Sequence, residues 1–385
     1  MDTDDKLELF KAPPTEEILT ESDLRSAIER EIPLKHYIGF EISGFLHLGS
    51  GIVTMSKVAD LQKAGVDCSV FLADFHAWIN NKLGGDLATI QKVAGGYYKE
   101  GFQKCLEVMG GDPNKIKFVL GSDLYEEHKS EFLKVMIDVS KNVNLARVKR
   151  SITIMGRKLG EEINFAMLLY PPMQVADIFI QNLNVIHAGM DQRKAHVIAR
   201  DVATKLKIHP LIYKKTLKGK TFEEKYKPIA IHTHLLAGLG KPPKWPIPKA
   251  KLQEVLSEMK MSKSQPNTCV FIHDTPEQIK YKMMQAFCPP KEIKFNPVLD
   301  WAKHVIFKAG RELEIKRAKK YGGNVHFYTY KDLEKVYSQG KLHPMDLKAG
   351  VADELIELLE PIRKHFKKPR IRKMKEELEK LTATR

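Results

Sequence analysis

Two lysines within five residues are the side chains of this chain best suited to binding a polyphosphate. The segment Lys260–Ser264 reads Lys-Met-Ser-Lys-Ser, has little apolar content and follows a proline-rich run at residues 242–248. Prolines and small polar residues predict a mobile loop here rather than a packed helix. Ammonium groups around a phosphate stabilise negative charge while a bond to phosphorus breaks, so we predict that Lys260 and Lys263 bind phosphate oxygens.

A histidine in a glycine-rich turn is the second candidate phosphate ligand. Gly44, Gly49 and Gly51 surround His47, and a helix is predicted to begin near Ser50. Glycine lets the backbone approach a ligand closely, and a helix N-terminus directs a positive partial charge towards it. An imidazole in this turn can donate a hydrogen bond to a phosphate oxygen.

A polar stripe on an otherwise apolar helix indicates a pocket for a small polar molecule. Pro171 and Pro172 suit the first turn of a helix. Gln174 and Asp177 then lie on one face, with Tyr170 just before them. Buried polar side chains need partners. Either these three satisfy one another and the backbone, or they bind a ligand, and we favour the ligand.

The elements that must position these residues alternate between strands and helices. Short apolar runs predict strands, and longer patterns predict helices, with strands at 36–40, 68–73, 116–120 and 185–189 and helices at 52–63, 86–109 and 191–207. Strands separated by helices form a parallel sheet that is covered on both faces. Ligands bind at the carboxyl edge of such a sheet, and His47 follows the first of these strands.

Length and composition indicate a folded protein of several domains. The 385 residues allow two or three domains, and 43% hydrophobic residues exclude a disordered chain. No apolar run approaches the ~20 residues that span a bilayer. The net charge is +15, and residues 361–385 hold ten Lys or Arg against three Glu. This basic end is typical of RNA binding, although a solvated terminal helix would have the same pattern.

Cysteine usage indicates a reducing compartment. The cysteines lie far apart and form no Cys-x-x-Cys pair: Cys68, Cys105, Cys269 and Cys288. The pattern argues against disulfides and against a structural zinc site. The acidic, polar segment Met1–Lys6 is unlike a secretory signal. We therefore expect a cytoplasmic protein without a protein-bound metal.

Three parts of the chain differ in pattern. Residues 1–34 predict a helical lead-in that ends at Pro33, and residues 35–269 predict the α/β domain. Residues 270–385 predict a mostly helical second domain, whose first helix follows Thr275. Within the α/β part, the lysine- and proline-rich residues 216–258 break the alternation, so we expect a surface insertion or linker that leads into the 260–264 loop.

Both phosphate-binding segments resemble the HIGH and KMSKS motifs of class I aminoacyl-tRNA synthetases. The match is complete at residues 260–264, whereas Ser50 stands where the first motif has histidine. Longer stretches resemble tyrosyl-tRNA synthetases of the archaeal and eukaryotic type, in the family's order: residues 37–49, 72–77, 170–177, 189–194 and 343–348. The resemblance implies an α/β fold of the class I synthetase type, with a Rossmann-like parallel-sheet domain followed by a mostly α-helical C-terminal domain.

The resemblance also implies activation of L-tyrosine by ATP with Mg²⁺, followed by transfer of the tyrosyl group to tRNA(Tyr). His47, Lys260 and Lys263 would be catalytic through the triphosphate. The full set of residues expected to bind ATP is Gly44, His47, Gly49, Ser50, Lys260, Met261, Ser262, Lys263 and Ser264. The residues expected to bind tyrosine are Tyr37, Tyr170, Gln174, Asp177 and Gln192.

Within the expected tyrosine site, Tyr37 and Asp177 would bind the phenolic hydroxyl, and the others the ammonium group and neighbouring atoms. Phenylalanine would leave the buried Tyr37 and Asp177 unpaired. The resulting discrimination is ~10⁴–10⁵, a magnitude for which tyrosyl-tRNA synthetases are themselves the reference case and which is not worked out from this sequence.

Anticodon recognition and dimerisation are further implications of the resemblance. Tyr321, His343 and Asp346 match positions that contact the first anticodon base, and an aromatic ring and a carboxylate acceptor suit that role. Asp346 is equally well read as the N-cap of a helix that begins at Leu347. Helices at 120–165, inserted between the halves of the nucleotide fold, would form a homodimer interface.

Three alternatives stay open from the sequence. A tryptophanyl-tRNA synthetase would share the fold and both ATP motifs, but an indole has no hydroxyl for Tyr37 and Asp177 to bind. A non-catalytic RNA-binding paralogue would have no need of His47 and the two lysines. A small-molecule adenylyltransferase would have no need of a basic helical domain, and salt-sensitive tRNA binding would distinguish it.

Overall fold

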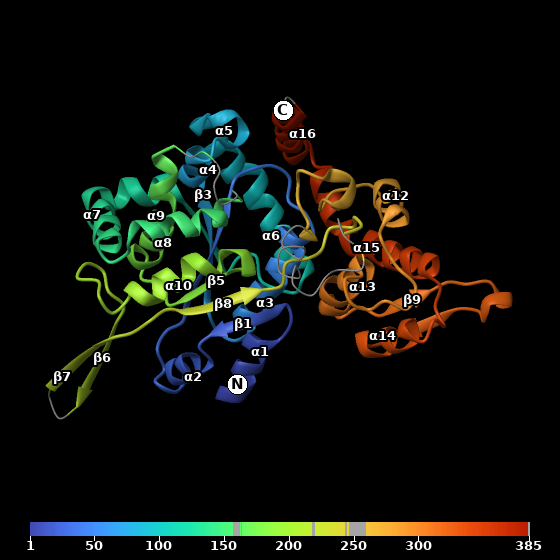
Figure 1. The fold of residues 1–385 in the computed structure, drawn as a ribbon, viewed down its shortest axis with the longest axis horizontal. Helices are drawn as coiled ribbons and strands as arrows, with labels where there is room; N and C mark the ends of the chain where they lie inside the picture. The colour runs from blue at the N-terminus through green and yellow to red at the C-terminus, as the bar shows by residue number, and fades with distance from the viewer. Residues whose placement is uncertain (157–161, 163, 218–219, 243–244, 246–258, 384–385) are drawn as a thin grey trace.

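The computed structural model describes residues 1–156, 162, 164–217, 220–242, 245 and 259–383 (Figure 1). A sheet with helices on both sides makes up the larger part, and a mostly helical C-terminal part packs beside it. Within the described ranges, no helix is both long enough and apolar enough to cross a membrane.

Six strands form the central sheet, in the order β1-β8-β5-β2-β3-β4. Their bounds are β1 (Thr15–Leu19), β2 (Lys35–Glu41), β3 (Asp67–Ala73), β4 (Ile116–Leu120), β5 (Val185–Gly189) and β8 (Ile229–Thr233). All neighbours pair in parallel except β1, which is antiparallel to β8. The predicted parallel sheet is confirmed.

The N-terminal segment contributes to this sheet, so the prediction of a purely helical lead-in over residues 1–34 is wrong. Helices α1 (Thr3–Lys11) and α2 (Glu21–Glu29) flank β1. The sequence of β1, Thr-Glu-Glu-Ile-Leu, is too polar to predict a strand. An edge strand tolerates such charge because it pairs on one side only.

Alternate side chains of each central strand enter different cores. On β3, Cys68, Val70 and Leu72 face the core that also holds α3 and α6. Phe71 and Ala73 face the core that holds α7, α9 and α10. Successive side chains of a strand point to opposite faces, so helices must cover both sides of the sheet.

The covering helices include those predicted at 52–63, 86–109 and 191–207. They are α3 (Thr54–Lys63), α4 (Asp74–Ile79), α5 (Leu87–Val93), α6 (Lys99–Val108), α7 (Gly121–Lys141), α8 (Leu145–Ser151), α9 (Ala166–Ile180) and α10 (Arg193–Val202). A π-helical turn at Gly49–Val53 precedes α3, and another at Ala94–Tyr98 joins α5 to α6. The predicted helix at 86–109 therefore forms as consecutive helical segments.

The predicted surface insertion at 216–258 is wrong where the chain enters β8, although its first part does lie in a surface hairpin. Strands β6 (Ile212–Leu217) and β7 (Lys220–Lys225) form a hairpin that projects from the molecule (Figure 1). Strand β8 follows, and all its residues are buried inside the main sheet. Strand β8 has only five residues and follows a charged hairpin, so its short apolar pattern does not predict a strand. Residues 218–219, 243–244 and 246–258 lie outside the described residues.

The C-terminal part is mostly helical, as predicted, but also contains a two-stranded sheet. Its elements are α12 (Pro276–Gln285), α13 (Pro297–Trp301), β9 (Leu313–Ile315), β10 (Val325–Phe327), α14 (Tyr330–Ser338), α15 (Pro344–Phe366) and α16 (Pro369–Ala383). Thr275 caps α12 with a capping box. Trp301, fully buried, belongs to the same hydrophobic core as α3 and α6, so this part is continuous with one face of the sheet.

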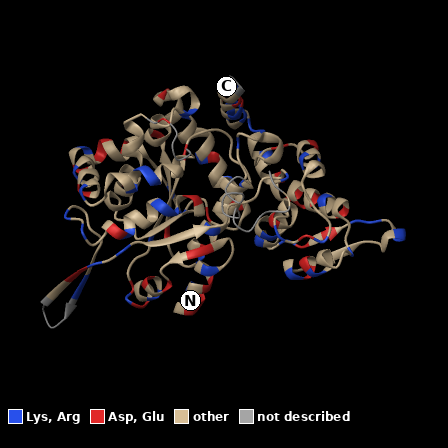
Figure 2. Ribbon diagram, in the orientation of Figure 1, with Lys and Arg blue, Asp and Glu red and all other residues tan. Residues whose placement is uncertain are grey.

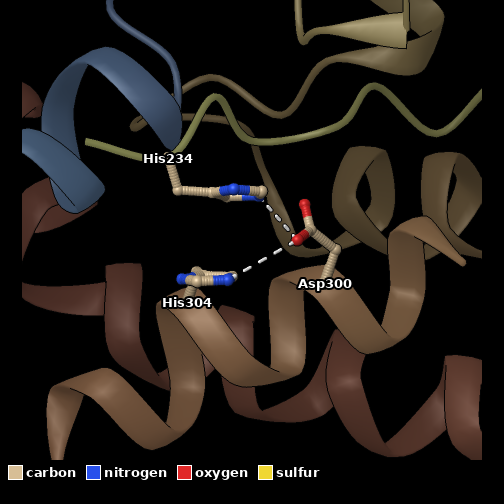
Figure 3. A group of neighbouring side chains, drawn as sticks. All are labelled: His234, Asp300 and His304. Atoms are coloured by element: carbon tan, nitrogen blue, oxygen red, sulfur yellow. Dashed lines mark hydrogen bonds and ion pairs between the residues drawn. The ribbon is translucent and has the colours of Figure 1, made fainter. Parts of the chain in front are cut away.

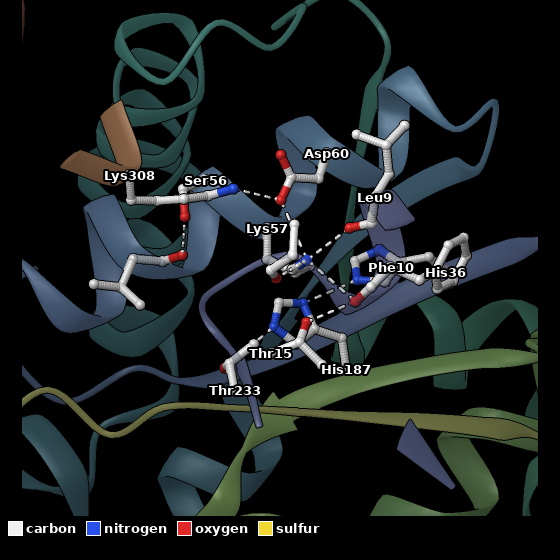
Figure 4. A network of polar contacts seen from close by, with 12 residues as sticks. Leu9, Phe10, Thr15, His36, Ser56, Lys57, Asp60, His187, Thr233 and Lys308 are labelled. Carbon is white, nitrogen blue, oxygen red and sulfur yellow. Dashed lines mark hydrogen bonds and ion pairs between the residues drawn. The ribbon is translucent and has the colours of Figure 1, made fainter. Parts of the chain in front are cut away.

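A buried lysine ties the N-terminal helix to this assembly (Figure 4). Lys57 on α3 is fully buried, and its ammonium donates to the carbonyls of Leu9 at 2.8 Å and Ala12 at 2.7 Å. These carbonyls lie at the end of α1, where helical partners run out. Asp60 pairs with Lys57 at 3.2 Å and with Lys308 of the C-terminal part at 2.6 Å. Burial lowers the pKa of Lys57 to about 8, although Asp60 acts in the opposite direction.

Candidate active site

A cavity of about 1190 Å³ opens at the carboxyl edge of the sheet. It brings together all the residues predicted to bind ATP and tyrosine: Tyr37, Gly44, His47, Gly49, Ser50, Tyr170, Gln174, Asp177, Gln192, Lys260, Met261, Ser262, Lys263 and Ser264. Segments more than two hundred residues apart in the chain therefore face one space. The position at the strand ends agrees with the rule for parallel sheets.

The turn around His47 fixes the orientation of its imidazole. Nδ1 of His47 accepts hydrogen bonds from the backbone N–H groups of Gly49 at 3.1 Å and Ser50 at 3.3 Å. Any Cβ at residue 49 would lie 3.1 Å from the imidazole, which favours glycine there. Burial, together with the charges of Lys263 and Lys260, lowers the pKa of His47 to about 3. The ring is therefore neutral and carries its proton on Nε2, ready to donate.

Ser50 uses its hydroxyl to stabilise this turn. Its Oγ accepts from the backbone N–H of His47 at 3.1 Å and lies 3.4 Å from the His47 carbonyl. The hydroxyl is thus engaged with the backbone of the motif.

Backbone contacts hold the 260–264 loop against the cavity. The N–H of Met261 donates to the Leu236 carbonyl at 2.7 Å, and the Met261 side chain is buried. Lys260 pairs with Asp191 at 2.9 Å. The ammonium of Lys263 donates to the Tyr98 hydroxyl at 2.9 Å. Lys260 therefore pairs with a carboxylate and Lys263 with a neutral hydroxyl. A bound phosphate can replace both of these partners.

The other end of the cavity is built on α9. This helix begins at Ala166, so Pro171 and Pro172 lie inside it, and the prediction that they form its first turn is wrong. The polar stripe survives because Gln174 and Asp177 keep their spacing of three residues on one face. Proline removes one helical hydrogen bond but does not force a new start when tertiary packing holds the helix.

Asp177 is the most unusual group in the cavity. Its side chain is 1% exposed, and its Oδ1 accepts from the hydroxyl of Tyr125 at 2.9 Å. His76 Nε2 lies 3.5 Å from the other carboxylate oxygen. Burial raises the pKa of Asp177 well above its usual range, while the Tyr125 hydrogen bond opposes the rise and Asp74 adds to it. Such a carboxylate gains from another hydrogen-bond donor.

The side chains beside Asp177 are also short of partners. Burial, and then the charge of Asp177, raises the pKa of the Tyr37 phenol, so it stays protonated. Gln174 donates to Gln192 at 3.4 Å, but its own Oε1 is buried without a partner. Both ring nitrogens of His76 are likewise buried without a hydrogen bond. Buried polar atoms are rarely left unpaired in proteins, so this end of the cavity has the composition of a ligand site.

Sequence reasoning missed several side chains of this site. Tyr125 lies on α7, in the segment assigned to dimerisation, and nothing in its local pattern connects it to Asp177. Tyr98 is the last residue of a π-helical turn, and no sequence pattern predicts that turn. His76 and Asp191 lie in stretches that resemble the family, and that resemblance is the signal that could have identified them.

The three residues predicted for the anticodon lie in the C-terminal part, away from the cavity. Tyr321 is 63% exposed and follows β9. His343, not Asp346, is the N-cap of α15, which corrects the reading of Asp346 as a cap. Arg317 joins the two segments, because it donates to the carbonyls of Gly323 at 3.0 Å and Lys341 at 3.3 Å.

A parallel sheet with a glycine-rich turn and a lysine loop at its carboxyl edge defines a nucleotide-binding α/β protein. The model of the family "tRNA synthetases class I (W and Y)" matches residues 29–360. The chain therefore belongs to this family of class I tRNA synthetases.

The relatives and solved structures agree with this assignment. The tyrosine–tRNA ligases of Thermococcus sibiricus and Pyrococcus furiosus are 56% and 55% identical over 370 residues, which is 96% of this chain and of each relative. The crystal structure of tyrosyl-tRNA synthetase complexed with L-tyrosine from Pyrococcus horikoshii has a TM-score of 0.91 and 53% identity, over 98% of this chain and 100% of that chain.

Proposed function

We propose that this protein is a tyrosine–tRNA ligase, which activates L-tyrosine with ATP and transfers the tyrosyl group to tRNA(Tyr). The observation that carries the proposal is the buried Asp177 beside the protonated phenol of Tyr37, both in the wall of the cavity. A phenolic hydroxyl needs one acceptor and one donor, and this pair supplies both. The relatives named above point to the same substrate.

The remaining polar groups of α9 and its neighbours suit the amino-acid backbone. Tyr170, Gln174 and Gln192 line the same cavity as Asp177 and the phosphate-binding residues. The unpaired Oε1 of Gln174 is an acceptor for an ammonium group. We assign these three side chains to the ammonium group of tyrosine and the atoms next to it.

The phosphate-binding end receives ATP. Neutral His47 donates from Nε2, and Lys260 and Lys263 leave their present partners for the triphosphate, while Gly44, Gly49, Ser50 and the rest of the loop shape the backbone around it. Mg²⁺ accompanies ATP as part of the substrate, bound mainly by phosphates and water.

The proposed reaction needs no protein nucleophile. The carboxylate of tyrosine attacks the α-phosphorus of ATP, pyrophosphate leaves, and the terminal ribose hydroxyl of tRNA then takes the tyrosyl group from the adenylate. The protein holds the two reactants together and supplies positive charge where the leaving pyrophosphate gains negative charge.

Two regions of the chain suit tRNA. The exposed Tyr321 and the turn at His343–Asp346 are joined through Arg317, and we assign them to the anticodon. Helix α16 carries many Lys and Arg residues (Figure 2). Its Glu379 and Thr382 line the cavity. Its position fits the end of tRNA that receives the amino acid, so we restrict the proposed anticodon-binding domain to the part of residues 270–385 that precedes α16.

A homodimer is part of this proposal. Leu133 and Ile137 lie one turn apart on α7 and are 50% and 49% exposed, and Leu145 on α8 is 58% exposed. Large apolar side chains that gather on one face favour burial against a partner. Charging of tRNA also implies a cytoplasmic location.

The proposal is tested by ATP–pyrophosphate exchange with tyrosine, tryptophan, phenylalanine and no amino acid in parallel. Exchange with tyrosine alone is the expected result. Exchange with tryptophan would overturn the substrate but keep the family, and folded protein without exchange for any amino acid would favour an RNA-binding paralogue.

A further inference from the structure

Two histidines and an aspartate form a compact group (Figure 3), and one of them, His234, lines the active-site cavity. His234 follows β8, Asp300 belongs to α13, and His304 lies one turn beyond Asp300. Nε2 of His234 is 2.7 Å from Asp300 Oδ1, and Nε2 of His304 is 3.8 Å from the same oxygen. The two imidazole rings stack with centroids 4.1 Å apart, and both point towards the carboxylate.

His304 lacks the partners that a buried imidazole normally has. Its Nδ1 is buried without a hydrogen bond, and its Nε2 is too far from Asp300 for one. Among the described residues, no other group makes a hydrogen bond to this ring. Nε2, the ring nitrogen that faces Asp300, therefore has no hydrogen bond to any described residue, and a cation between His304 and Asp300 would give it a partner.

Surrounding groups already orient the other two side chains as metal ligands. Glu16 of β1 receives a hydrogen bond from Nδ1 of His234 at 2.5 Å. Nε2 of His234 faces the cluster and donates to Oδ1 of Asp300 at 2.7 Å, so a bound ion would take the place of this proton. The N–H of Ala237 donates to Oδ2 of Asp300 at 2.9 Å, which leaves Oδ1 to face the cluster. Metal-binding histidines typically donate their second N–H to a carboxylate, and ligating carboxylates are hydrogen-bonded in turn.

The spacing of the facing atoms suits a small cation. One ligand atom from each of the three residues lies within 4.8 Å of the others. Ligands 2.0–2.2 Å from a tetrahedral ion are roughly 3.3–3.6 Å apart. The hydrogen-bonded pair of His234 and Asp300, at 2.7 Å, would have to separate slightly, and His304, at 3.8 Å from Asp300, would have to move slightly closer. Two imidazoles with one carboxylate favour zinc-like ions over Mg²⁺, which prefers oxygen ligands.

We propose that His234, Asp300 and His304 bind a divalent transition-metal ion such as Zn²⁺, with Glu16 as the hydrogen-bond partner that orients His234. Water would occupy the fourth position, because the His234 and Asp300 side chains are 22% and 18% exposed. This site departs from the sequence-based expectation of no protein-bound metal, which considered cysteine ligands only.

The position of the site gives it a structural role that does not depend on the proposed function. The ion would join β1 through Glu16, the segment after β8, and the C-terminal part through α13. That segment continues to Leu236, whose carbonyl holds Met261 of the 260–264 loop. A bound ion would therefore fix the C-terminal part against the backbone that supports the lysine loop.

Direct metal titration tests the proposal on the full chain, without any affinity tag and after removal of metals by a chelator. Co²⁺ should bind at one equivalent with the absorption of a four-coordinate nitrogen and oxygen site, and Zn²⁺ should displace it. His304→Gln should weaken binding at least 100-fold, and Glu16→Gln should weaken it by about 10- to 100-fold. His209→Gln, a surface histidine beside Glu131, is the matched control and should bind as the wild type does.

Thermal melting supplies a second measurement. Saturating Zn²⁺ should raise the Tm of the wild type but not that of His304→Gln, because an ion that binds only the folded state stabilises it. Mg²⁺ at the same concentration should have no such effect. Absence of saturable Co²⁺ binding, a thiolate-to-cobalt charge-transfer band, or equal binding by His304→Gln would overturn the proposal. If His304→Gln does not fold, the exposed Glu16→Gln variant decides, and unchanged affinity there refutes the site.

Discussion

The hydroxyl of Tyr125 provides the sharpest test of the tyrosine site, because only the three-dimensional structure connects it to Asp177. Tyr125→Phe removes one oxygen and keeps the ring, which packs against Phe132 with centroids 4.2 Å apart. The lost contact is a buried hydrogen bond of 2.9 Å to the Asp177 carboxylate. Hydrogen bonds to charged groups contribute about 1.5–3 kcal/mol, or roughly a 10- to 150-fold change in an equilibrium constant.

The effect should depend on pH, and its direction follows from the causes of the Asp177 pKa. Burial raises that pKa, and the Tyr125 hydrogen bond opposes the rise. Without the hydroxyl the pKa of Asp177 rises further, because the ionised carboxylate loses a donor that favours it. Protonated Asp177 is a weaker acceptor for the substrate phenol, so KM for tyrosine should increase near neutral pH and recover as the pH is raised.

The assay is tyrosine-dependent ATP–pyrophosphate exchange at several pH values on both sides of neutrality. We expect a roughly 10- to 150-fold increase in KM for tyrosine, an alkaline shift of the pH profile, and little change in KM for ATP. Tyr226→Phe is the matched control, because it loses a half-buried hydroxyl 3.2 Å from Asn184, outside the cavity. A KM close to that of the wild type with an unshifted profile, or an equal loss in the control, would refute this role for Tyr125.

Three further predictions concern Lys263, Asp346 and Asp177. Lys263→Ala should slow adenylate formation by ~10²-fold or more with little change in tyrosine affinity, because it removes charge that stabilises the transition state; unchanged single-turnover rates would exclude that role. Asp346→Ala should weaken charging of tRNA(Tyr) and spare ATP–pyrophosphate exchange, and equal losses in both assays would argue against anticodon recognition. Asp177→Asn should abolish activation of tyrosine yet raise the free energy of unfolding near neutral pH. Burial raises the pKa of Asp177 in the folded protein above its value in the unfolded chain. Above ~pH 4 the unfolded chain therefore loses this proton more readily, which lowers the free energy of unfolding of the wild type. The full loss is about 1.4 kcal/mol for every tenfold difference between the folded and unfolded acid dissociation constants. The stability advantage of the Asp177→Asn variant in thermal melting should therefore disappear below ~pH 4, where the wild-type carboxyl is protonated in both states. A variant that is less stable than the wild type near neutral pH would contradict this reasoning.

The phosphate-binding end of the site could be predicted from the sequence because its residues are local. His47 lies in one glycine-rich turn and the two lysines lie in one loop, so short stretches of chain contain most of the relevant chemistry. Strand and helix periodicity then placed the turn at the carboxyl edge of a parallel sheet. The same local signals failed where packing decides the structure, as at Pro171 inside α9 and at the buried strand β8 behind a charged hairpin.

The sequence by itself determined the family, the parallel sheet and the candidate residues, because periodic patterns and contiguous motifs are properties of short segments. Only the tertiary structure decided how Tyr125 reaches Asp177, how Lys263 reaches Tyr98, and how His234 meets Asp300 and His304. Each of these contacts joins residues that lie far apart in the chain. Their distances depend on how whole helices pack against the sheet, and no local pattern in the chain records that packing.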